Sequence, residues 1–288
     1  MEVKDFNTKE QNTWCPGCPN MGINQATKEA LAELVNEGKI KAKDVAISVG
    51  IGCHAKIYDY LNVNGFYGLH GRTIPVALGI KMGNPELTVL GFGGDGDTYA
   101  EGIAHFVQNC RHNANMTMLV HNNQTFSLTT GQATPTSEKG FVGASTPFGE
   151  AEEPMNPIAL ALVSGASFVA RSYALDTVHL KETIKQAIEH KGFSFVEIIQ
   201  PCIIFHNTVS YFKDHIYRLE DNDAQDFNKA LELSREWDYS FDKDKKVSIG
   251  TFYKIKKPTF ESQWPQLRKP CYLIDRKIDW EKLSEEFK

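Results

Sequence analysis

The stretch TVLGFGGDGD, residues 88–97, decides the fold, because it joins a strand to a turn made of glycines and carboxylates. Residues 88–92 are largely apolar, as expected for a strand that is buried on both faces of a parallel sheet. Residues 93–97 interrupt this run with Gly and Asp, which dominate tight turns. In an open parallel sheet, such a turn lies beyond the carboxyl end of its strand, where ligands bind.

A second stretch, MTMLVHNNQT at residues 116–125, also runs from an apolar strand into polar residues. Helical spacing over residues 98–110 separates the two stretches, so their strands can lie side by side in parallel. Asp95 and Asn123, 28 positions apart, then fall at neighbouring strand ends. A lone Gly-Asp-Gly is as often a surface turn as a site. The pairing instead favours a site for Mg²⁺ and a phosphate, with oxygen ligands, glycines and a helix N-terminus together.

Short apolar strands alternate with helices along most of the chain. The expected strands are 45–49, 88–92, 116–120, 168–170 and 195–199, and the expected helices are 23–35, 73–81, 98–110, 157–164 and 177–191. This alternation predicts the α/β class, as a three-layer αβα fold with a mostly parallel sheet and helices on both faces. Residues 124–156 lack a period and are expected to form a long functional loop.

The last part of the chain has a different character. After residue 210, charged and aromatic residues mix with only a weak period. We therefore expect a domain over residues 1–210 and a C-terminal extension over residues 211–288, which packs on the domain or on a partner.

Composition excludes several classes of protein. The 288 residues are 41% hydrophobic and 23% charged, with a formal net charge of −5, which is ordinary for a soluble globular protein. Lys and Arg form no basic stripe, so nucleic acid is not an expected partner. We find neither a secretory signal nor an apolar run of the roughly 20 residues that a membrane-spanning helix needs. We expect a cytoplasmic protein with reduced thiols.

The cysteines suggest a metal centre. Cys15 and Cys18 form a Cys-Pro-Gly-Cys loop, which alone could be a zinc half-site or a redox pair. Cys53 and Cys202 each follow an expected strand, so both should lie at the sheet edge of Asp95. Four thiolates from three segments are what a [4Fe–4S] cluster needs. The other two cysteines, Cys110 and Cys271, are expected to pack only.

Seven motifs occur together in one order. They are WCPGC at 14–18, GIGC at 50–53, GLHGR at 68–72, GDGD at 94–97, NN at 122–123, TTGQATPT at 129–136 and PC at 201–202. With these motifs the chain resembles the beta subunits of 2-oxoacid:ferredoxin oxidoreductases, from Trp14 to His206. The resemblance implies a thiamine-diphosphate-binding fold.

The resemblance also implies three cofactors: thiamine diphosphate, Mg²⁺ and a [4Fe–4S] cluster. The metal ligands of the family fall on Asp95, Asn123 and the backbone carbonyl of Thr125, and the cluster ligands on Cys15, Cys18, Cys53 and Cys202. The residues implied to line the cofactor are Ile51, Gly52, Cys53, His54, His70, Gly71, Gly94, Asp95, Gly96, Asp97, Asn123, Thr125, Leu128 and Thr129.

Lys56 and His70 are the candidates for catalysis. Family members place a lysine three residues after the position of Cys53, where it can meet the substrate carboxylate, and His70 could polarise the substrate carbonyl. The alternatives are a solvated surface lysine and a structural histidine. Three positions depart from the family pattern. His54 replaces a common Ser, Asn122 a frequent Asp, and Phe126-Ser127 a usual Tyr-Gly, so we expect an altered substrate pocket.

The implied reaction is the reversible oxidative decarboxylation of a 2-oxo acid to an acyl-CoA and CO₂, with electrons passing through the cluster to ferredoxin. The GLHGR and TTGQ segments favour 2-oxoglutarate or a broad range of 2-oxo acids over pyruvate alone. Thiamine enzymes also need a glutamate beside the pyrimidine, and neither Glu86 nor Glu101 lies in a recognisable pyrimidine-binding pattern. An alpha subunit, or an alpha–gamma chain, is expected to supply it in a heterodimer.

Two other functions fit part of the sequence. A non-redox thiamine-dependent decarboxylase would leave Cys53 and Cys202 without a shared purpose. A zinc-binding interaction protein held by Cys15 and Cys18 would leave the pairing of Asp95 and Asn123 unexplained.

Overall fold

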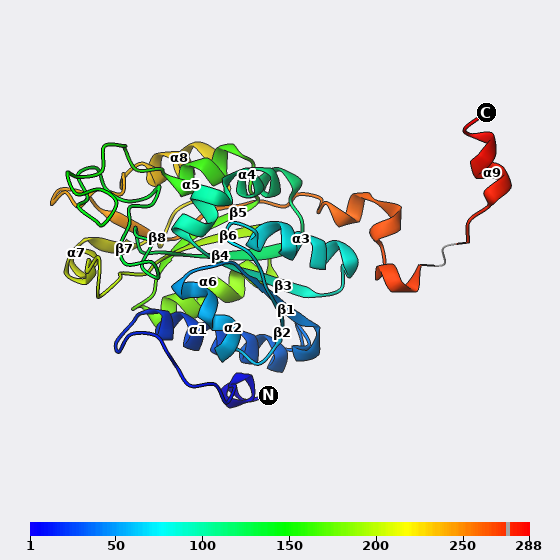
Figure 1. Ribbon diagram of the computed structural model, residues 1–288, viewed down its shortest axis with the longest axis horizontal. Helices are drawn as coiled ribbons and strands as arrows, with labels where there is room; N and C mark the ends of the chain where they lie inside the picture. Colours follow the sequence, from blue (N-terminus) through cyan, green and yellow to red (C-terminus); the bar gives the residue numbers. More distant parts are fainter. Residues whose placement is uncertain (275–276) are drawn as a thin grey trace.

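The computed structural model describes residues 1–274 and 277–288. These residues form one eight-stranded sheet in the order β2-β1-β3-β4-β6-β5-β8-β7 (Figure 1). The strands are β1 (Val45–Val49), β2 (Asn64–Tyr67), β3 (Thr88–Gly94), β4 (Met116–Asn122), β5 (Phe168–Tyr173), β6 (Phe193–Ile199), β7 (Ile216–Arg218) and β8 (Val247–Lys254). The helices are α1 (Asn20–Asn36), α2 (Ile57–Tyr60), α3 (Thr73–Gly83), α4 (Ile103–His112), α5 (Pro157–Val163), α6 (Thr177–Glu189), α7 (Val209–His215), α8 (Phe227–Ser234) and α9 (Trp280–Glu285).

Helices cover both faces of the sheet. The helices α1, α2 and α6 lie on one face, and α3, α4, α5 and α8 lie on the other (Figure 1). The central strands β3 and β4 are buried along their length because side chains that alternate along a strand enter opposite cores. Leu90 and Phe92 pack under α1 and α6, whereas Val89 packs under α3 and α4. The expected three-layer fold with a mostly parallel sheet is confirmed.

The sheet continues past residue 210. β8 pairs antiparallel with β5, and β7 pairs parallel with β8. Phe252 of β8 enters the core under α5 and α8, and Trp237 and Tyr239 are buried in a separate aromatic cluster beside β8. The same sheet and cores thus extend through β8. The division of the chain into a domain and an extension at residue 210 stays a prediction.

The helix expected over residues 98–110 is wrong in its first turn. Asp97–Glu101 forms a π-helical turn, Gly102 follows, and the α-helical hydrogen bonding of α4 starts at Ile103. A Cβ at position 102 would lie only 2.8 Å from the carbonyl oxygen of Asp97. This crowding shows why a glycine ends the turn. Such π-helical turns occur often at functional sites.

The chain leaves the sheet after β8 and ends in an arm. Phe260 stacks on His112 at the end of α4, with ring centroids 5.2 Å apart. Beyond it the C-terminal segment points away from the body (Figure 1), and Tyr272, Trp280 and Phe287 are exposed there. Within the described ranges, no helix has the length and apolar character required to span a membrane.

Candidate cofactor and cluster site

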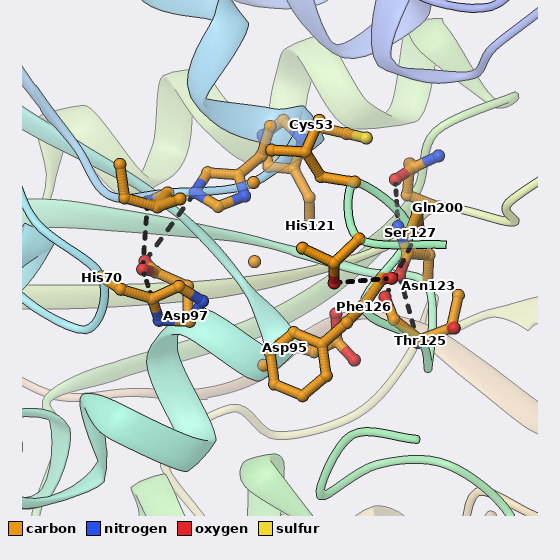
Figure 2. Close-up of a pocket in the computed structure, with 17 residues that line it drawn as sticks. Cys53, His70, Asp95, Asp97, His121, Asn123, Thr125, Phe126, Ser127 and Gln200 are labelled. Atoms are coloured by element: carbon orange, nitrogen blue, oxygen red, sulfur yellow. Dashed lines mark hydrogen bonds and ion pairs between the residues drawn. The ribbon is translucent and has the colours of Figure 1, made fainter. Parts of the chain in front are cut away.

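A pocket opens at the carboxyl edge of the sheet, beyond the ends of β1, β3, β4 and β6 (Figure 2). It is lined by Ile51, Gly52, Cys53, His54, His70, Gly94, Asp95, Gly96, Asp97, His121, Asn123, Thr125, Phe126, Ser127, Leu128, Thr129 and Gln200. The structure thus brings together all of the residues expected to line a cofactor except Gly71. Gly71 lies directly behind the pocket, where its N–H donates to Asp97.

Asp95 lies in the turn that follows β3 and is buried. Its Oδ2 accepts hydrogen bonds from the hydroxyls of Thr134 at 2.6 Å and Thr136 at 3.0 Å. Burial raises the pKa of Asp95 to about 6, although these two hydroxyl hydrogen bonds lower it. The long loop expected over residues 124–156 therefore returns to the strand end and orients this carboxylate.

Asn123 and Thr125 lie opposite Asp95 in the turn after β4 (Figure 2). The side-chain oxygen of Asn123 accepts the backbone N–H of Thr125 at 3.2 Å, so the amide is oriented within this turn. Its Nδ2 donates to the side-chain oxygen of Gln200 at 3.1 Å. Two segments far apart in the sequence, the turn after β4 and the residue after β6, are thus connected at one strand edge.

Asp97 is buried and directed away from Asp95. Its Oδ1 accepts the backbone N–H groups of Ile51 at 3.1 Å and Gly71 at 2.7 Å, and its Oδ2 accepts the hydroxyl of Thr73 at 3.1 Å. A Cβ at Gly50 would overlap this carboxylate. Asp97 therefore connects the loops after β1 and β2, each of which carries residues of the pocket.

Three histidines surround this region. His54 Nε2 lies 3.7 Å from Asp97 Oδ2, and burial lowers the pKa of His54 to about 4, so the ring is neutral near pH 7. His121 is also buried, and its Nδ1 contacts Asn20 Oδ1 at 2.7 Å. His70 is partly exposed at the pocket rim, with Nδ1 3.0 Å from the carboxylate of Glu101. The catalytic role of His70 stays a prediction.

The four cysteines expected to bind a cluster line a second cavity, of about 190 Å³, which adjoins the pocket. Burial and the neighbouring thiols of Cys18 and Cys202 raise the pKa of Cys53 to about 11. Burial also raises the pKa of Cys18, with Cys15 and Cys202 adding to the effect. These mutual effects reflect four thiols gathered in one place. Cys110 is buried in the core between α4 and the sheet, far from them in the fold.

The two cavities share part of their walls. Cys53, Asn123 and Gln200 line both, together with Ser127 and Leu128. Gln200 also donates to the carbonyl of Pro201 at 3.1 Å. In the N-terminal loop, the indole N–H of Trp14 donates to the carbonyl of Cys53 at 2.7 Å, which holds the loop of Cys15 and Cys18 over this edge.

Lys56 lines the cysteine cavity and is not among the residues that line the first pocket. Its Nζ donates to the carbonyl of Thr13 at 3.0 Å. Its positive charge lowers the pKa of Cys53, against the larger effect of burial. The contact with a substrate carboxylate stays a prediction.

The sequence reasoning missed His121 and Gln200 as lining residues of the pocket, whereas Phe126 and Ser127 were expected to alter it. Each adjoins a motif that was recognised, and the signal that could have found them is position, because His121 lies at the carboxyl end of β4 and Gln200 directly follows β6. Asn20 was missed too. It starts α1, and only the folded chain shows that it contacts His121.

Two family models match the chain. The thiamine pyrophosphate enzyme C-terminal TPP-binding domain matches residues 50–198, and the C-terminal part of the pyruvate ferredoxin oxidoreductase beta subunit matches residues 202–269. The first match contains the strands and turns of the pocket. The second contains β7 and β8.

Whole-length relatives agree. Subunit beta of 2-oxoacid:ferredoxin oxidoreductase 1 of Aeropyrum pernix is 39% identical, over 99% of this chain and 91% of its own length. The 2-oxoglutarate synthase subunit KorB of Methanocaldococcus jannaschii is 33% identical, over 88% of this chain and 92% of its own length. The solved 2-oxoglutarate:ferredoxin oxidoreductase from Magnetococcus marinus, with 2-oxoglutarate, coenzyme A and succinyl-CoA bound, matches with a TM-score of 0.90 and 34% identity. That match covers 100% of this chain and 96% of the solved one.

These similarities confirm the resemblance seen in the motifs and favour the redox enzyme over the non-redox decarboxylase and the zinc-binding protein. The chain belongs to the beta subunits of the 2-oxoacid:ferredoxin oxidoreductases.

Proposed function

We propose that this subunit binds thiamine diphosphate through Mg²⁺, carries a [4Fe–4S] cluster, and acts with an alpha subunit on 2-oxoglutarate or a broader range of 2-oxo acids. The products are an acyl-CoA and CO₂, and ferredoxin accepts the electrons in the cytoplasm. The observation that carries this proposal is the shared wall between the cofactor pocket and the four-cysteine cavity, formed by Cys53, Asn123 and Gln200.

The residues present fit Mg²⁺. Asp95 is a buried carboxylate whose hydrogen-bond partners are uncharged hydroxyl and backbone groups, so a cation would supply the countercharge it lacks. The amide of Asn123 and the carbonyl of Thr125 lie in the adjacent turn, and such neutral oxygens complete the shell that Mg²⁺ prefers. We assign these three residues to the metal and the metal to the diphosphate.

The pocket also fits an anionic diphosphate. Gly94 and Gly96 line the pocket, and without a Cβ they allow a phosphate to approach the backbone closely. We place the diphosphate against the Gly94–Asp97 turn, with Leu128 and Thr129 beside the thiazolium ring.

The cysteine cavity fits an iron–sulfur cluster. The backbone N–H of Phe205 points to Cys202 Sγ at 3.4 Å, and the side-chain amide of Gln200 points to Cys18 Sγ at 3.9 Å. Hydrogen bonds to sulfur are among the means by which proteins tune such clusters. Burial keeps the thiols of Cys18 and Cys53 protonated in the absence of metal, so iron must displace these protons when it binds.

Thiamine diphosphate supplies a thiazolium that takes up the electrons left when CO₂ departs. A thiazolium ring held beside Leu128, which lines both cavities, would lie next to the cysteine cavity, and the electrons would have a short exit. We assign the holding of the substrate to His70 at the pocket rim and to Lys56 beside the cysteines. Phe126 lies across the pocket from His70, with ring centroids 5.9 Å apart.

We assign the glutamate that activates the pyrimidine to the alpha subunit. The described residues lining the pocket include no glutamate, and Glu101, the nearest, lies at the rim beside His70. Leu69 and Leu128 at this rim are 75% and 47% exposed. Apolar side chains exposed beside a buried cofactor pocket suit cover by a second subunit.

The test is co-expression with the large, alpha subunit, followed by anaerobic assay of viologen reduction with coenzyme A and a panel of 2-oxo acids. We expect reduction that depends on thiamine diphosphate, with 2-oxoglutarate among the best substrates. A complex that contains no iron yet releases an aldehyde from the 2-oxo acid would overturn the proposal. This chain expressed alone should bind iron but reduce no viologen.

A further inference from the structure

Gln124 lies between the two metal ligands proposed in the turn after β4, Asn123 and Thr125. Its backbone adopts the left-handed conformation, with φ of 56°. Residues other than glycine rarely adopt this conformation, which costs free energy, and it persists only where the surroundings enforce it. The left-handed residue brings the side chain of Asn123 and the backbone of Thr125 to the same side. The position of both ligands therefore depends on what holds Gln124.

The side chain of Gln124 supplies that hold. It is buried, and its Nε2 donates to the carbonyl of Thr136 at 2.6 Å and to the carbonyl of Tyr239 at 2.9 Å. Its backbone N–H donates to Asn122 Oδ1 at 3.1 Å, and its carbonyl accepts the hydroxyl of Ser137 at 2.7 Å. Gln124 thus forms hydrogen bonds with four other residues. One of these partners, Tyr239, is distant in sequence.

That distant residue, Tyr239, is itself in the left-handed region, with φ of 65°, and fully buried. Its ring stacks on Trp237 with centroids 4.2 Å apart. Its hydroxyl lies 2.8 Å from one oxygen of Glu197 and 3.0 Å from the other, and it accepts a hydrogen bond from Arg171 at 3.0 Å. Both ends of the contact between Gln124 and Tyr239 are therefore strained and buried.

The network closes back on the metal site. Arg171 pairs with Glu197 at 2.7 Å, and Glu197 accepts the side-chain amide of Asn122 at 2.8 Å. Asn122 in turn accepts the hydroxyl of Thr136 at 2.9 Å, and that hydroxyl also lies 3.0 Å from Asp95. The strand residues Asn122, Glu197 and Arg171 come from β4, β6 and β5, which are adjacent in the sheet.

We propose that Trp237 and Tyr239 position the metal-binding turn at Asn123–Thr125, acting through Gln124 and through the buried pair of Glu197 and Arg171. These two aromatic residues lie within residues 202–269, the part of the chain that resembles ferredoxin oxidoreductase beta subunits and lies outside the thiamine-binding match. Residues 202–269 therefore support the proposed metal site that lies within residues 50–198. This inference rests on the proposed role of the turn as a metal-binding site.

The first test compares Gln124→Ala with Gln124→Gly. Both variants remove the side chain that anchors the turn, but glycine adopts the left-handed conformation freely and alanine does not. A loss of packing alone would weaken binding equally in the two variants, or more in Gln124→Gly. We measure the Mg²⁺ concentration at half-maximal binding of thiamine diphosphate by tryptophan fluorescence, in the complex co-expressed with the large subunit. We expect Gln124→Ala to raise it about tenfold or more, as for other residues behind metal ligands, and Gln124→Gly to recover part of that loss.

The second test is Tyr239→Phe, which removes the hydroxyl that contacts Glu197 and Arg171 but keeps the backbone carbonyl that holds Gln124. Its matched control is Tyr173→Phe, because Tyr173 is buried at the end of β5 with a hydroxyl that has no hydrogen-bond partner among the described residues. We expect Tyr239→Phe to raise the Mg²⁺ midpoint several-fold and Tyr173→Phe to leave it unchanged. Melting in EDTA reports the stability of each metal-free complex separately.

Equal midpoints for Gln124→Ala and Gln124→Gly would overturn the inference, whether both match the unmodified complex or both are weakened. So would a Tyr239→Phe complex that melts at a lower temperature in EDTA yet keeps the midpoint of the unmodified complex. An unmodified complex that binds thiamine diphosphate equally well in Mg²⁺ and in EDTA would instead contradict the proposed metal site. The two failures are therefore distinguishable.

Discussion

The carboxylate of Asp97 accepts the backbone N–H of Gly71 at 2.7 Å, across 26 positions of sequence. The same oxygen accepts the N–H of Ile51, so one buried side chain joins the loops on two sides of the pocket. A carboxylate can accept all of these donors at once, whereas a carboxamide presents a donor in place of one oxygen. The spacing of the loops after β1 and β2 is therefore sensitive to the replacement of one carboxylate oxygen of Asp97.

We expect Asp97→Asn to weaken binding of thiamine diphosphate and to lower the free energy of unfolding by about 1–3 kcal/mol, because one buried donor is left unpaired. Calorimetric titration and urea denaturation measure the two effects. Asp59→Asn, at an exposed position, is the control and should change neither. If Asp97→Asn binds the cofactor as the unmodified chain does, Asp97 does not set the spacing of the loops.

Gly96 is expected to tolerate no side chain. A Cβ at this position would overlap the ring of Phe126, which lines the pocket. Gly96→Ala should therefore displace Phe126 and reduce the affinity for thiamine diphosphate at least tenfold, as measured by calorimetric titration. Gly79→Ala in α3 is the matched control, because no atom lies within 4 Å of the added methyl. It should leave binding intact and stabilise the helix by about 0.5–1 kcal/mol.

Cys53→Ser and Cys202→Ser should each abolish or destabilise the cluster. Hydroxyl oxygen is a poor substitute for thiolate sulfur at iron, and each variant removes one of four ligands. Iron content, and visible absorption that dithionite bleaches, measure the outcome in protein purified anaerobically. Cys271→Ser in the C-terminal segment is the control and should retain a full complement of iron. Equal iron in Cys202→Ser and the control would exclude Cys202 as a ligand.

The ion pair between Arg171 and Glu197 is fully buried. Glu197→Gln leaves the guanidinium charged in the core without its counterion, so we expect it to lower the free energy of unfolding by about 3–5 kcal/mol. The exposed pair of Lys229 and Glu232 supplies the control. Glu232→Gln should cost no more than about 0.5 kcal/mol in the same urea titration. Similar losses of unfolding free energy in the two variants would mean that burial of the pair of Arg171 and Glu197 does not increase the cost of breaking it.

His190 should make stability fall in acid. Burial and the nearby charge of Lys254 lower the pKa of His190 to about 4, and its Nε2 lies 2.7 Å from the hydroxyl of Ser167. Between its unfolded value of about 6.5 and pH 4, the unfolded chain binds a proton that the folded chain does not. The free energy of unfolding therefore falls as the pH drops through this window and levels off below it.

The measurement is urea denaturation from about pH 7 to pH 4.5. His190→Gln should lose less stability over this range than the unmodified chain. Parallel curves of unfolding free energy against pH for the two proteins would show that His190 does not contribute to the loss of stability in acid. His206, whose pKa burial also lowers to about 4, contributes in the same direction and keeps the curve of the variant from becoming flat.

The parts of the fold that could be predicted are those whose own residues show an apolar run or a helical period. The strands β3 and β4 are continuous apolar runs, and the polar residues Asp95 and Asn123 directly follow them, so their meeting at one edge follows from parallel pairing. The strand β2 could not be predicted, because Asn64–Tyr67 is exposed along its length and is set by its pairing with β1. Its four residues, Asn-Gly-Phe-Tyr, are too few to show a period of their own.

The β7–β8 pair was missed for a related reason. The strand β8 is apolar, but its antiparallel place beside β5 depends on contacts between segments about eighty positions apart. In the site, the turn and cysteine motifs were visible in sequence, whereas the partners behind them were not. Nothing local to Tyr239 indicates that it contacts Gln124.

The contact between Gln124 and Tyr239 spans 115 positions of the chain and so bears on biosynthesis. Domains begin to fold during synthesis, with their N-terminal parts first. A nascent chain that has emerged only through Gln200 already contains the residues lining the pocket, but it lacks the aromatic pair behind the turn. With the aromatic pair positioning the turn as proposed, we expect chains that end before residue 239 to bind metal and thiamine diphosphate poorly, and full loading only after translation has passed that residue.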